Sequence, residues 1–147
     1  MAATDLHHLA IKTNDVDATV RFWNEVVGSH SVDRPDFPFP GAWLQFGTTM
    51  IHLYGGDAAR NDDGEFDSGS AAIDHVALAA EGFDEMRDLL IERKLGWRQL
   101  AIPSFNIWQL FVYDPNGVLV ELNFYSAREP HGSKGPDGTN LYDAGRF

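Results

Sequence analysis

With 147 residues, of which 44% are hydrophobic, the chain is long enough for one buried core and short for two ordinary domains. Its formal net charge of -11 argues against binding to nucleic acid or to an anionic membrane, and the absence of cysteine excludes disulfides, thiolate metal sites and cysteine nucleophiles. We therefore expect a single domain that acts on a small molecule and that holds any metal ion with nitrogen and oxygen ligands.

The N-terminal residues and the hydropathy pattern predict where the protein resides. The first ten residues have neither the basic start nor the long apolar run of a secretory signal. No stretch of about eighteen uninterrupted apolar residues occurs anywhere in the chain. We expect a cytoplasmic protein with no membrane partner.

The pattern of residues from about 5 to 55 predicts a first module with the element order βαβββ. The alternating apolar stretch LHHLAIK predicts a strand, and Val16, Val20, Trp23 and Val27 then have helical spacing. Gly28 follows where a helix-ending glycine is expected, since glycine adopts the left-handed conformation at little steric cost. The stretches GAWLQFG and TTMIHLYG complete the module as a pair of strands.

Two irregular segments interrupt this pattern. The insert RPDFPFP, from Arg34 to Pro40, is rich in proline and aromatic residues, which predicts a rigid loop with Phe37 and Phe39 buried or lining a cleft. Residues from about 56 to 70 are polar and glycine-rich, which predicts a linker.

Residues 71–125, approximately, repeat the first module. The segment IDHVALAAEGFDEMRDLLIERKLG aligns without gaps, until the ends, with LHHLAIKTNDVDATVRFWNEVVG. Its helix is indicated by Phe83, Met86 and Leu90, and Gly96 is expected to end it. The strands FNIWQLFVYD and GVLVELNFY follow, joined by an Asp-Pro-Asn-Gly hairpin turn that begins at Asp114.

The predicted architecture is therefore α+β, with two tandem βαβββ modules in which a helix covers one face of each sheet. The tail from about residue 126 to 147 has no periodicity. We expect this tail to be irregular and to run over the surface or over a partner subunit.

Aligning the two modules pairs polar residues of the kind that bind metals. His75 lies 67 residues after His8, and Glu121 lies 69 residues after His52, a difference that one small loop insertion explains. Each is flanked by apolar residues that would face the helix. Because strand side chains alternate between faces, the four polar side chains should point to the opposite side of each sheet.

A divalent metal ion is the single cause that explains all four positions. A carboxylate within VLVELNF is costly to bury without a positive partner, and no lysine or arginine lies near it in the sequence. A metal ion would supply that charge, bound by His8, His52, His75 and Glu121.

The remaining polar and aromatic residues are weaker candidates for a metal or substrate site. His7 is paired with Asp74 by the repeat and should alternate to the other face, so we do not expect it to be a ligand. His30 and His131 have no counterparts and are expected at the surface. Seven residues are candidates for lining a substrate pocket: Trp43, Tyr54, Arg98, Trp108, Gln109, Phe111 and Asn123.

The segments DLHHLAIKTNDVDATVRFWNEVVG, MIHLYGG, AIDHVALAA and YDPNGVLVELNF resemble the vicinal oxygen chelate superfamily, also called the glyoxalase, bleomycin-resistance and extradiol dioxygenase fold, over about residues 5–125. The resemblance implies two modules whose sheets curl into a cleft with a divalent ion at its base. His8, His75 and Glu121 match the usual ligands of the superfamily, and His52 matches its fourth, more variable position. The resemblance also implies a homodimer, with the cleft formed within one chain or between two.

The sequence departs from two branches of that superfamily. Glyoxalase I usually has an acidic or amide residue at the position of His52, so the paired-glutamate mechanism of that enzyme does not carry over. Extradiol dioxygenases have a histidine and a tyrosine ahead of the turn, whereas here no histidine lies between Pro103 and Asp114, and Phe111 stands in place of the tyrosine. Antibiotic-binding members lack the metal ligands that this chain keeps.

The expected function is that of a metal-dependent lyase or isomerase acting on a small substrate with adjacent oxygens, with Zn, Ni, Co, Mn or Fe(II) as a Lewis acid. Glu121 or His52 would transfer the proton. One alternative is an Fe(II) extradiol-type dioxygenase, because His8, His75 and Glu121 alone would form a facial triad. The other is a small-molecule binding or resistance protein without turnover.

Overall fold

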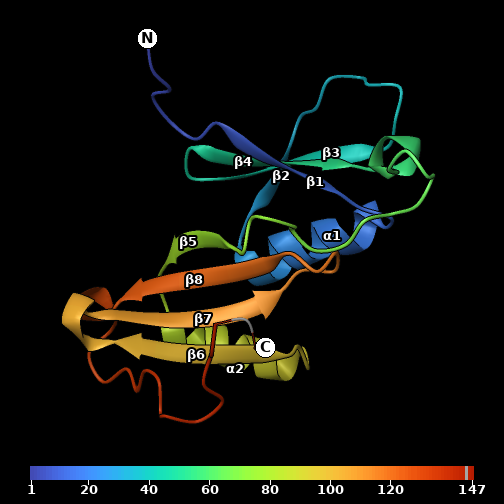
Figure 1. Cartoon of the computed structure of the whole chain (residues 1–147). Coiled ribbons are helices and arrows are strands. Elements are labelled where there is room, and N and C mark those ends of the chain that lie inside the picture. The colour runs from blue at the N-terminus through green and yellow to red at the C-terminus, as the bar shows by residue number, and fades with distance from the viewer. Residues whose placement is uncertain (145) are drawn as a thin grey trace. The chain divides into compact units, whose positions relative to one another are not determined.

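The computed structural model describes residues 1–144 and 146–147, and it divides into two compact units, Met1–Ser68 and Gly69–Phe147. Each unit contains one open four-stranded sheet of mixed direction with the element order βαβββ (Figure 1). The predicted α+β class with two tandem modules is thus confirmed. The boundary between the units falls within the predicted linker, which also holds the short 3-10 helix η2 (Gly56–Ala59).

The first unit follows the predicted order of elements. They are β1 (His8–Lys12), α1 (Val16–Phe22), the π-helix η1 (Trp23–Val27), β2 (His30–Val32), β3 (Gly41–Phe46) and β4 (Thr49–Tyr54). The sheet order is β1-β4-β3-β2, in which β1 runs parallel to β4 and the other neighbours are antiparallel. Asp15 begins the helical segment by accepting a hydrogen bond from the Ala18 N–H, and Gly28 ends it in the left-handed conformation with φ of 92°, as predicted.

The second unit repeats this arrangement. Its elements are β5 (Val76–Ala80), α2 (Phe83–Glu92), β6 (Trp97–Ile102), the 3-10 helix η3 (Pro103–Phe105), β7 (Ile107–Tyr113), β8 (Leu119–Tyr125) and the 3-10 helix η4 (Ser126–Arg128). The sheet order is β5-β8-β7-β6, with β5 parallel to β8. The order matches that of the first unit strand for strand, which is the structural basis of the sequence repeat.

The predicted end of the second helix is wrong. The helix stops at Glu92, and Lys94 rather than Gly96 takes the left-handed conformation, with φ of 55°. The Leu95 N–H donates to the Leu90 carbonyl at 3.0 Å and the Lys94 N–H donates to the Ile91 carbonyl at 3.0 Å, which closes the helix two residues earlier than the glycine suggested.

The hairpin turn between β7 and β8 is confirmed. The Asp114 carboxylate accepts hydrogen bonds from the backbone N–H groups of Asn116 at 2.8 Å and Val118 at 2.9 Å. Gly117 adopts φ of 78°, which explains the glycine at this position.

Strand alternation places the apolar core on the helix side of each sheet. In the first unit Ile51 and Leu53 are almost fully buried on that side. In the second unit the ring of Phe83, at the start of α2, packs edge-on against Phe124 at 5.3 Å between centroids. His52 lies between Ile51 and Leu53, and Glu121 lies between the buried residues Val120 and Leu122, so both lie on the other face of their sheets.

The tail beyond η4 is irregular, as expected, and it is bound to the second unit. It forms an isolated parallel β-bridge between Leu141 and Gln99 at the edge of β6 (Figure 1, in red). Among the described residues, no helix has the length and apolar character needed to cross a membrane.

Candidate metal centre

The first unit brings His8 and His52 into contact. Ala10 of β1 is the register partner of His52 on β4, and His8 lies two residues before Ala10, so both histidines occupy the same face. Their rings stack with a centroid distance of 3.9 Å and an interplanar angle of 15°. His8 is the first residue of β1 rather than a mid-strand residue, which leaves its ring exposed.

His52 is enclosed between two rings. Trp43, its partner on β3, stacks on the side away from His8, with a centroid distance of 4.2 Å and an interplanar angle of 5°. His52 is only 6% exposed, and its Nε2 atom is buried without a hydrogen-bond partner among the described residues. Burial lowers the pKa of His52, and the neighbouring His8 and His7 lower it further. The ring is therefore held neutral, with a nitrogen able to bind a cation.

His7 does not turn to the opposite face, contrary to the alternation argument. It precedes β1, so the strand does not fix its direction, and its Nδ1 atom lies 2.8 Å from Nδ1 of His8. The contact involves Nδ1 of His8 and leaves Nε2 of the same ring able to bind a metal ion.

The second unit brings His75 and Glu121 into contact in the same register. Ala77 of β5 is the partner of Glu121 on β8, and His75 lies two residues before Ala77, just ahead of the strand. The His75 Nε2 atom is 3.1 Å from Oε2 of Glu121. The relation between His8 and His52 is thus reproduced between His75 and Glu121, although the two offsets in the sequence differ by two residues.

Amide side chains hold the carboxylate of Glu121. Gln109 Nε2 and Asn123 Nδ2 each donate to Oε1 of Glu121 at 2.7 Å, and Gln109 also donates to Oδ1 of Asn123 at 2.9 Å. Glu121 is 8% exposed. The amides fix one carboxylate oxygen and leave Oε2 directed at His75, and no lysine or arginine among the described residues pairs with this carboxylate.

Asp74 contacts His75 in the way that His7 contacts His8. Its Oδ2 atom lies 2.8 Å from Nδ1 of His75. An ionised carboxylate can only accept, so Nδ1 of His75 is the donor in this contact, and the contact orients the ring with Nε2 toward Glu121. The sequence repeat had already paired Asp74 with His7, and that pairing was the available signal for a shared role.

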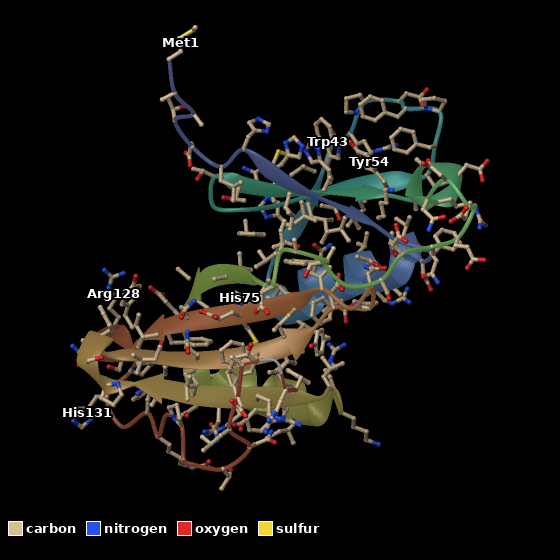
Figure 2. All side chains as sticks on the ribbon, in the orientation of Figure 1. Met1, Trp43, Tyr54, His75, Arg128 and His131 are labelled. Atoms are coloured by element: carbon tan, nitrogen blue, oxygen red, sulfur yellow. The ribbon has the colours of Figure 1, made fainter. Side chains whose placement is uncertain are left out.

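The predicted pocket residues divide between the two faces of the sheets. Figure 2 shows Trp43 and Tyr54 on one side of the first sheet, the side away from α1. In the second unit, register places Arg98 and Phe111 on the face of Glu121, together with Gln109 and Asn123.

Trp108, predicted as a pocket residue, lies on the other face of the sheet from Glu121. It lies one residue from Gln109 and therefore faces the helix side, where its ring packs edge-on against Phe83 at 5.5 Å. Arg98 lies on the Glu121 side of the sheet, but the tail contacts its guanidinium. Nη1 of Arg98 donates to the Asn140 side chain at 3.3 Å, and the guanidinium lies 5.0 Å from the centroid of the Phe147 ring.

The proline-rich loop of the first unit extends the aromatic surface beside His52. Phe37 and Phe39 stack in parallel at 5.6 Å, and Phe39 meets Tyr54 edge-on at 5.2 Å. Arg34 fixes the loop by donating to the Phe39 carbonyl at 2.8 Å. Phe37 is 40% exposed and Phe39 is half-buried, so the prediction that both are buried is wrong for Phe37; the two rings instead form one aromatic surface with Trp43 and Tyr54.

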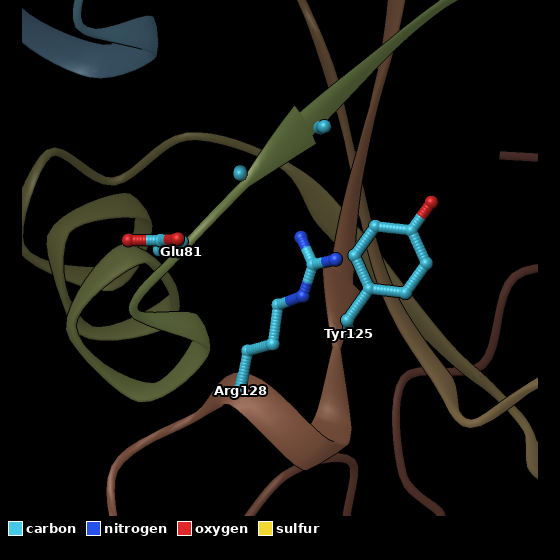
Figure 3. Close-up of a pocket in the computed structure, with 5 residues that line it drawn as sticks. Glu81, Tyr125 and Arg128 are labelled. Atoms are coloured by element: carbon cyan, nitrogen blue, oxygen red, sulfur yellow. The ribbon is translucent and has the colours of Figure 1, made fainter.

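Within the described residues, no group of three or more histidine, aspartate or glutamate side chains is already arranged to hold a metal ion. Each unit instead presents two of the four predicted ligands. A separate cavity of about 320 Å³ in the second unit is lined by Ala79, Ala80, Glu81, Tyr125 and Arg128, with the Arg128 guanidinium 4.8 Å from the Tyr125 ring centroid (Figure 3). None of the predicted site residues lines it.

Comparison with known proteins relates the chain to one superfamily. The family model described as Glyoxalase/Bleomycin resistance protein/Dioxygenase superfamily matches residues 5–122. The chain is 26% identical over 126 residues to Glyoxylase I 4 of Arabidopsis thaliana, which covers 81% of this chain and 70% of the relative.

Solved structures share the fold at low sequence identity. A lactoylglutathione lyase from Agrobacterium tumefaciens is 18% identical with a TM-score of 0.64, covering 87% of this chain and 98% of its own. The fosfomycin resistance protein FosX from Listeria monocytogenes is 13% identical with a TM-score of 0.66, covering 84% and 94%. The chain is thus similar in fold to a protein named as a lyase and to one named for antibiotic resistance.

Proposed function

The chain belongs to the glyoxalase, bleomycin resistance protein and dioxygenase superfamily, and from that membership we propose that it is a metal-dependent lyase or isomerase. It acts by proton transfer on a small substrate that offers two adjacent oxygen atoms. The proposed ligands of one divalent ion are His8, His52, His75 and Glu121.

One observation carries the proposal: both units place two side chains of ligand type at the same register positions. His8 and His52 touch in one unit, and His75 and Glu121 touch in the other. The equal register of β1 with β4 and of β5 with β8 produces both contacts. Residues without a common role would not be expected to recur at these positions.

The residues also fit a metal ion chemically. Nε2 of His52 is a buried nitrogen without a partner among the described residues, and the lowered pKa of this histidine keeps it neutral, as a ligand must be. The buried carboxylate of Glu121 supplies negative charge. Nitrogen and oxygen ligands of this kind suit Zn, Ni, Co, Mn and Fe(II).

The ion, when bound, would polarise a substrate carbonyl and so acidify the adjacent C–H group. Two side chains of the chain are candidates to take that proton. Glu121 has Oε1 fixed by two amides, and its Oε2, which lies 3.1 Å from Nε2 of His75, is the oxygen that would accept the proton. His52 is neutral because its pKa is lowered, so it can also accept.

The aromatic surface of the first unit suits the remainder of the substrate. Trp43 stacks on His52, and the aromatic surface continues from Trp43 through Phe37 and Phe39 to Tyr54. Gln109 and Asn123 of the second unit provide polar groups beside Glu121. A small substrate with a polar, oxygen-bearing end and an apolar remainder matches these two kinds of surface.

Metal content tests the site. Protein purified without chelator should contain close to one divalent ion per chain, and the variants His75→Ala and Glu121→Ala should lose most of it. His30→Ala, which removes an exposed histidine of β2, is the control and should keep the parental content. A parent that takes up no ion, even after divalent ions are added back, would contradict the proposal and favour a binding protein without metal.

Proton transfer is tested with dihydroxyacetone, which has adjacent oxygens and acidic C–H groups. The metal-loaded parent in D₂O should exchange these protons faster than the metal-free protein, as followed by NMR. Glu121→Gln with metal retained should lose the exchange if Glu121 is the base, whereas unchanged exchange in that variant would shift the role to His52.

An Fe(II) dioxygenase is the second candidate. His52 is already held by stacking between His8 and Trp43, so it can keep its place without being a ligand. The remaining His8, His75 and Glu121 would then form a facial triad. Iron in the purified protein together with oxygen consumption on addition of catechol would favour this reaction, and a bound ligand of unchanged mass would favour a resistance or binding role.

A further inference from the structure

The tail of the second unit forms a strap, defined here as residues 129–142, that is tied first to α2. The Glu129 carboxylate accepts hydrogen bonds from the N–H groups of Gly82 at 3.1 Å and Phe83 at 2.7 Å at the start of the helix. Asp84, in the first helical turn, accepts from the N–H groups of Lys134 at 2.7 Å and Gly135 at 3.2 Å. The start of the helix and the strap therefore satisfy each other's backbone donors.

The strap then passes Trp108 on the helix side of the sheet. Gly135 adopts φ of +65°, and a Cβ atom at this position would lie 2.7 Å from the Trp108 ring. Only glycine fits both the conformation and the space. This close approach keeps the strap against the edge of the sheet.

Gln99 of β6 fixes the strap at the sheet edge. Its N–H donates to the Asn140 carbonyl at 3.0 Å, and its carbonyl accepts from the Tyr142 N–H at 2.9 Å. Its fully buried side chain donates to Asp137 Oδ1 at 2.6 Å and to the Thr139 carbonyl at 2.7 Å. The strap thus pairs with β6 through an isolated bridge between Leu141 and Gln99.

Beyond this edge the strap reaches the face that carries Glu121. The Tyr142 ring stacks on Phe111 with a centroid distance of 3.7 Å and an interplanar angle of 8°. Phe111 is the direct register partner of Glu121, so its ring lies on the Glu121 side of the sheet. The phenol of Tyr142 forms no hydrogen bond with the described residues, although its backbone is fixed.

We propose that Tyr142 is a substrate-binding residue whose phenol donates a hydrogen bond to a substrate oxygen beside Glu121. The inference rests on the proposed function, and it adds a donor from the strap to those that the strands carry. A donor next to a buried carboxylate selects substrates whose oxygen is anionic or becomes so during proton transfer.

The electrostatic surroundings suit a donor. Burial raises the pKa of Tyr142, and the negative charges of Asp74, Glu121 and Asp143, with Tyr113, act in the same direction. The phenol therefore keeps its proton at neutral pH. The stacking on Phe111 sets the plane of the ring, which limits the positions that the O–H group can reach.

The test uses 4-nitrocatechol, a coloured compound with two adjacent oxygens, and the full-length, metal-loaded protein. Tyr142→Phe keeps the ring that stacks on Phe111 and removes only the hydroxyl. We expect the dissociation constant of 4-nitrocatechol to rise by roughly 3- to 10-fold, as for the loss of one hydrogen bond, with unchanged metal content. Tyr113→Phe, an exposed tyrosine of β7, is the matched control and should bind like the parent.

A second variant tests whether the strap positions the Tyr142 phenol. Asp137→Ala removes the carboxylate that binds the Gln99 side chain and Thr139, while it keeps the phenol. It should weaken 4-nitrocatechol binding, and adding Tyr142→Phe to it should cause little further loss, because the two changes affect one contact.

The outcomes separate the inference from the proposed function. Unchanged binding in Tyr142→Phe, an equal loss in Tyr113→Phe, or a loss of metal in Tyr142→Phe would each overturn the role of Tyr142 while the metal site stands. A parent protein that takes up no metal ion would overturn the proposed function and this inference together.

Discussion

Two of the proposed ligand histidines, His8 and His75, are each contacted by the residue immediately before them in the chain. His7 meets Nδ1 of His8, and Asp74 meets Nδ1 of His75, each at 2.8 Å. A contact of this kind sets the ring orientation and leaves Nε2 as the ligand atom. The repeat thus extends from the proposed ligands to the residues that orient them.

Removing the orienting contact should weaken metal binding. We expect Asp74→Ala to lower the affinity for the divalent ion by about 10- to 100-fold, because His75 loses the acceptor that fixes its proton on Nδ1. The affinity is measured by competition with a coloured chelator. Asp88→Ala, which removes an exposed carboxylate of α2, is the charge-matched control. Equal affinities in the parent and in Asp74→Ala would show that Asp74 does not orient the ligand.

The lowered pKa of His52 predicts how stability depends on pH. Below the ordinary value of 6.5, the unfolded chain binds a proton at His52 more readily than the folded chain does. The free energy of unfolding of the metal-free protein should therefore fall as the pH is lowered from 7.5 through 6.5 toward the folded-state pKa.

Urea unfolding at pH 7.5 and 5.5 measures this effect. His52→Gln should show a smaller loss of stability between the two values, because the titrating ring is gone, and His30→Gln should behave like the parent. A loss in His52→Gln as large as in the parent would assign the pH dependence to other groups.

At the scale of elements, local rules account for most boundaries. Asp15 and Gly28 bound the first helical segment as their residue types predict. The second helix departs from the rule because Lys94 takes the left-handed position and Gly96 belongs to the approach to β6. The bonds from Leu95 and Lys94 to the last helical turn stabilise this ending enough to tolerate a residue with a side chain.

The conformation of Lys94 predicts a stabilising substitution. Lys94→Gly should raise the free energy of unfolding by about 1 kcal/mol, since glycine adopts φ of 55° without the steric penalty of a Cβ atom. Lys94→Ala, which removes the charge and keeps the Cβ atom, should not show this gain. Urea denaturation at neutral pH measures both, and a less stable glycine variant would contradict the assignment.

At the scale of the whole molecule, two units of one architecture each supply half of the proposed ligand set. The first unit adds an aromatic surface beside His52, and the second adds amides beside Glu121 and a strap that has no counterpart in the first. The duplication therefore preserves the register of the proposed ligands while the neighbouring residues have diverged. This divergence is where the specificity of the proposed reaction is expected to lie.

The sequence by itself determined the fold class, the two modules and the pairing of His8 with His75 and of His52 with Glu121. These follow from strand alternation, helical spacing and a repeat, all of which depend on near neighbours in the chain. The side of the sheet occupied by His52 and Glu121 followed for the same reason, because each is flanked by core residues.

Only the tertiary structure decided which side chains lie on the same face as the proposed metal ligands. The register of β7 turns Trp108 toward Phe83 of α2, and His7, which lies just outside β1, contacts the ring of His8. Tyr142 could not be predicted, since its segment has no periodicity and reaches Phe111 through bonds to Gln99, more than forty residues earlier in the chain. Contacts between such distant segments depend on how backbone donors and acceptors at a sheet edge are satisfied, which a local sequence pattern does not encode.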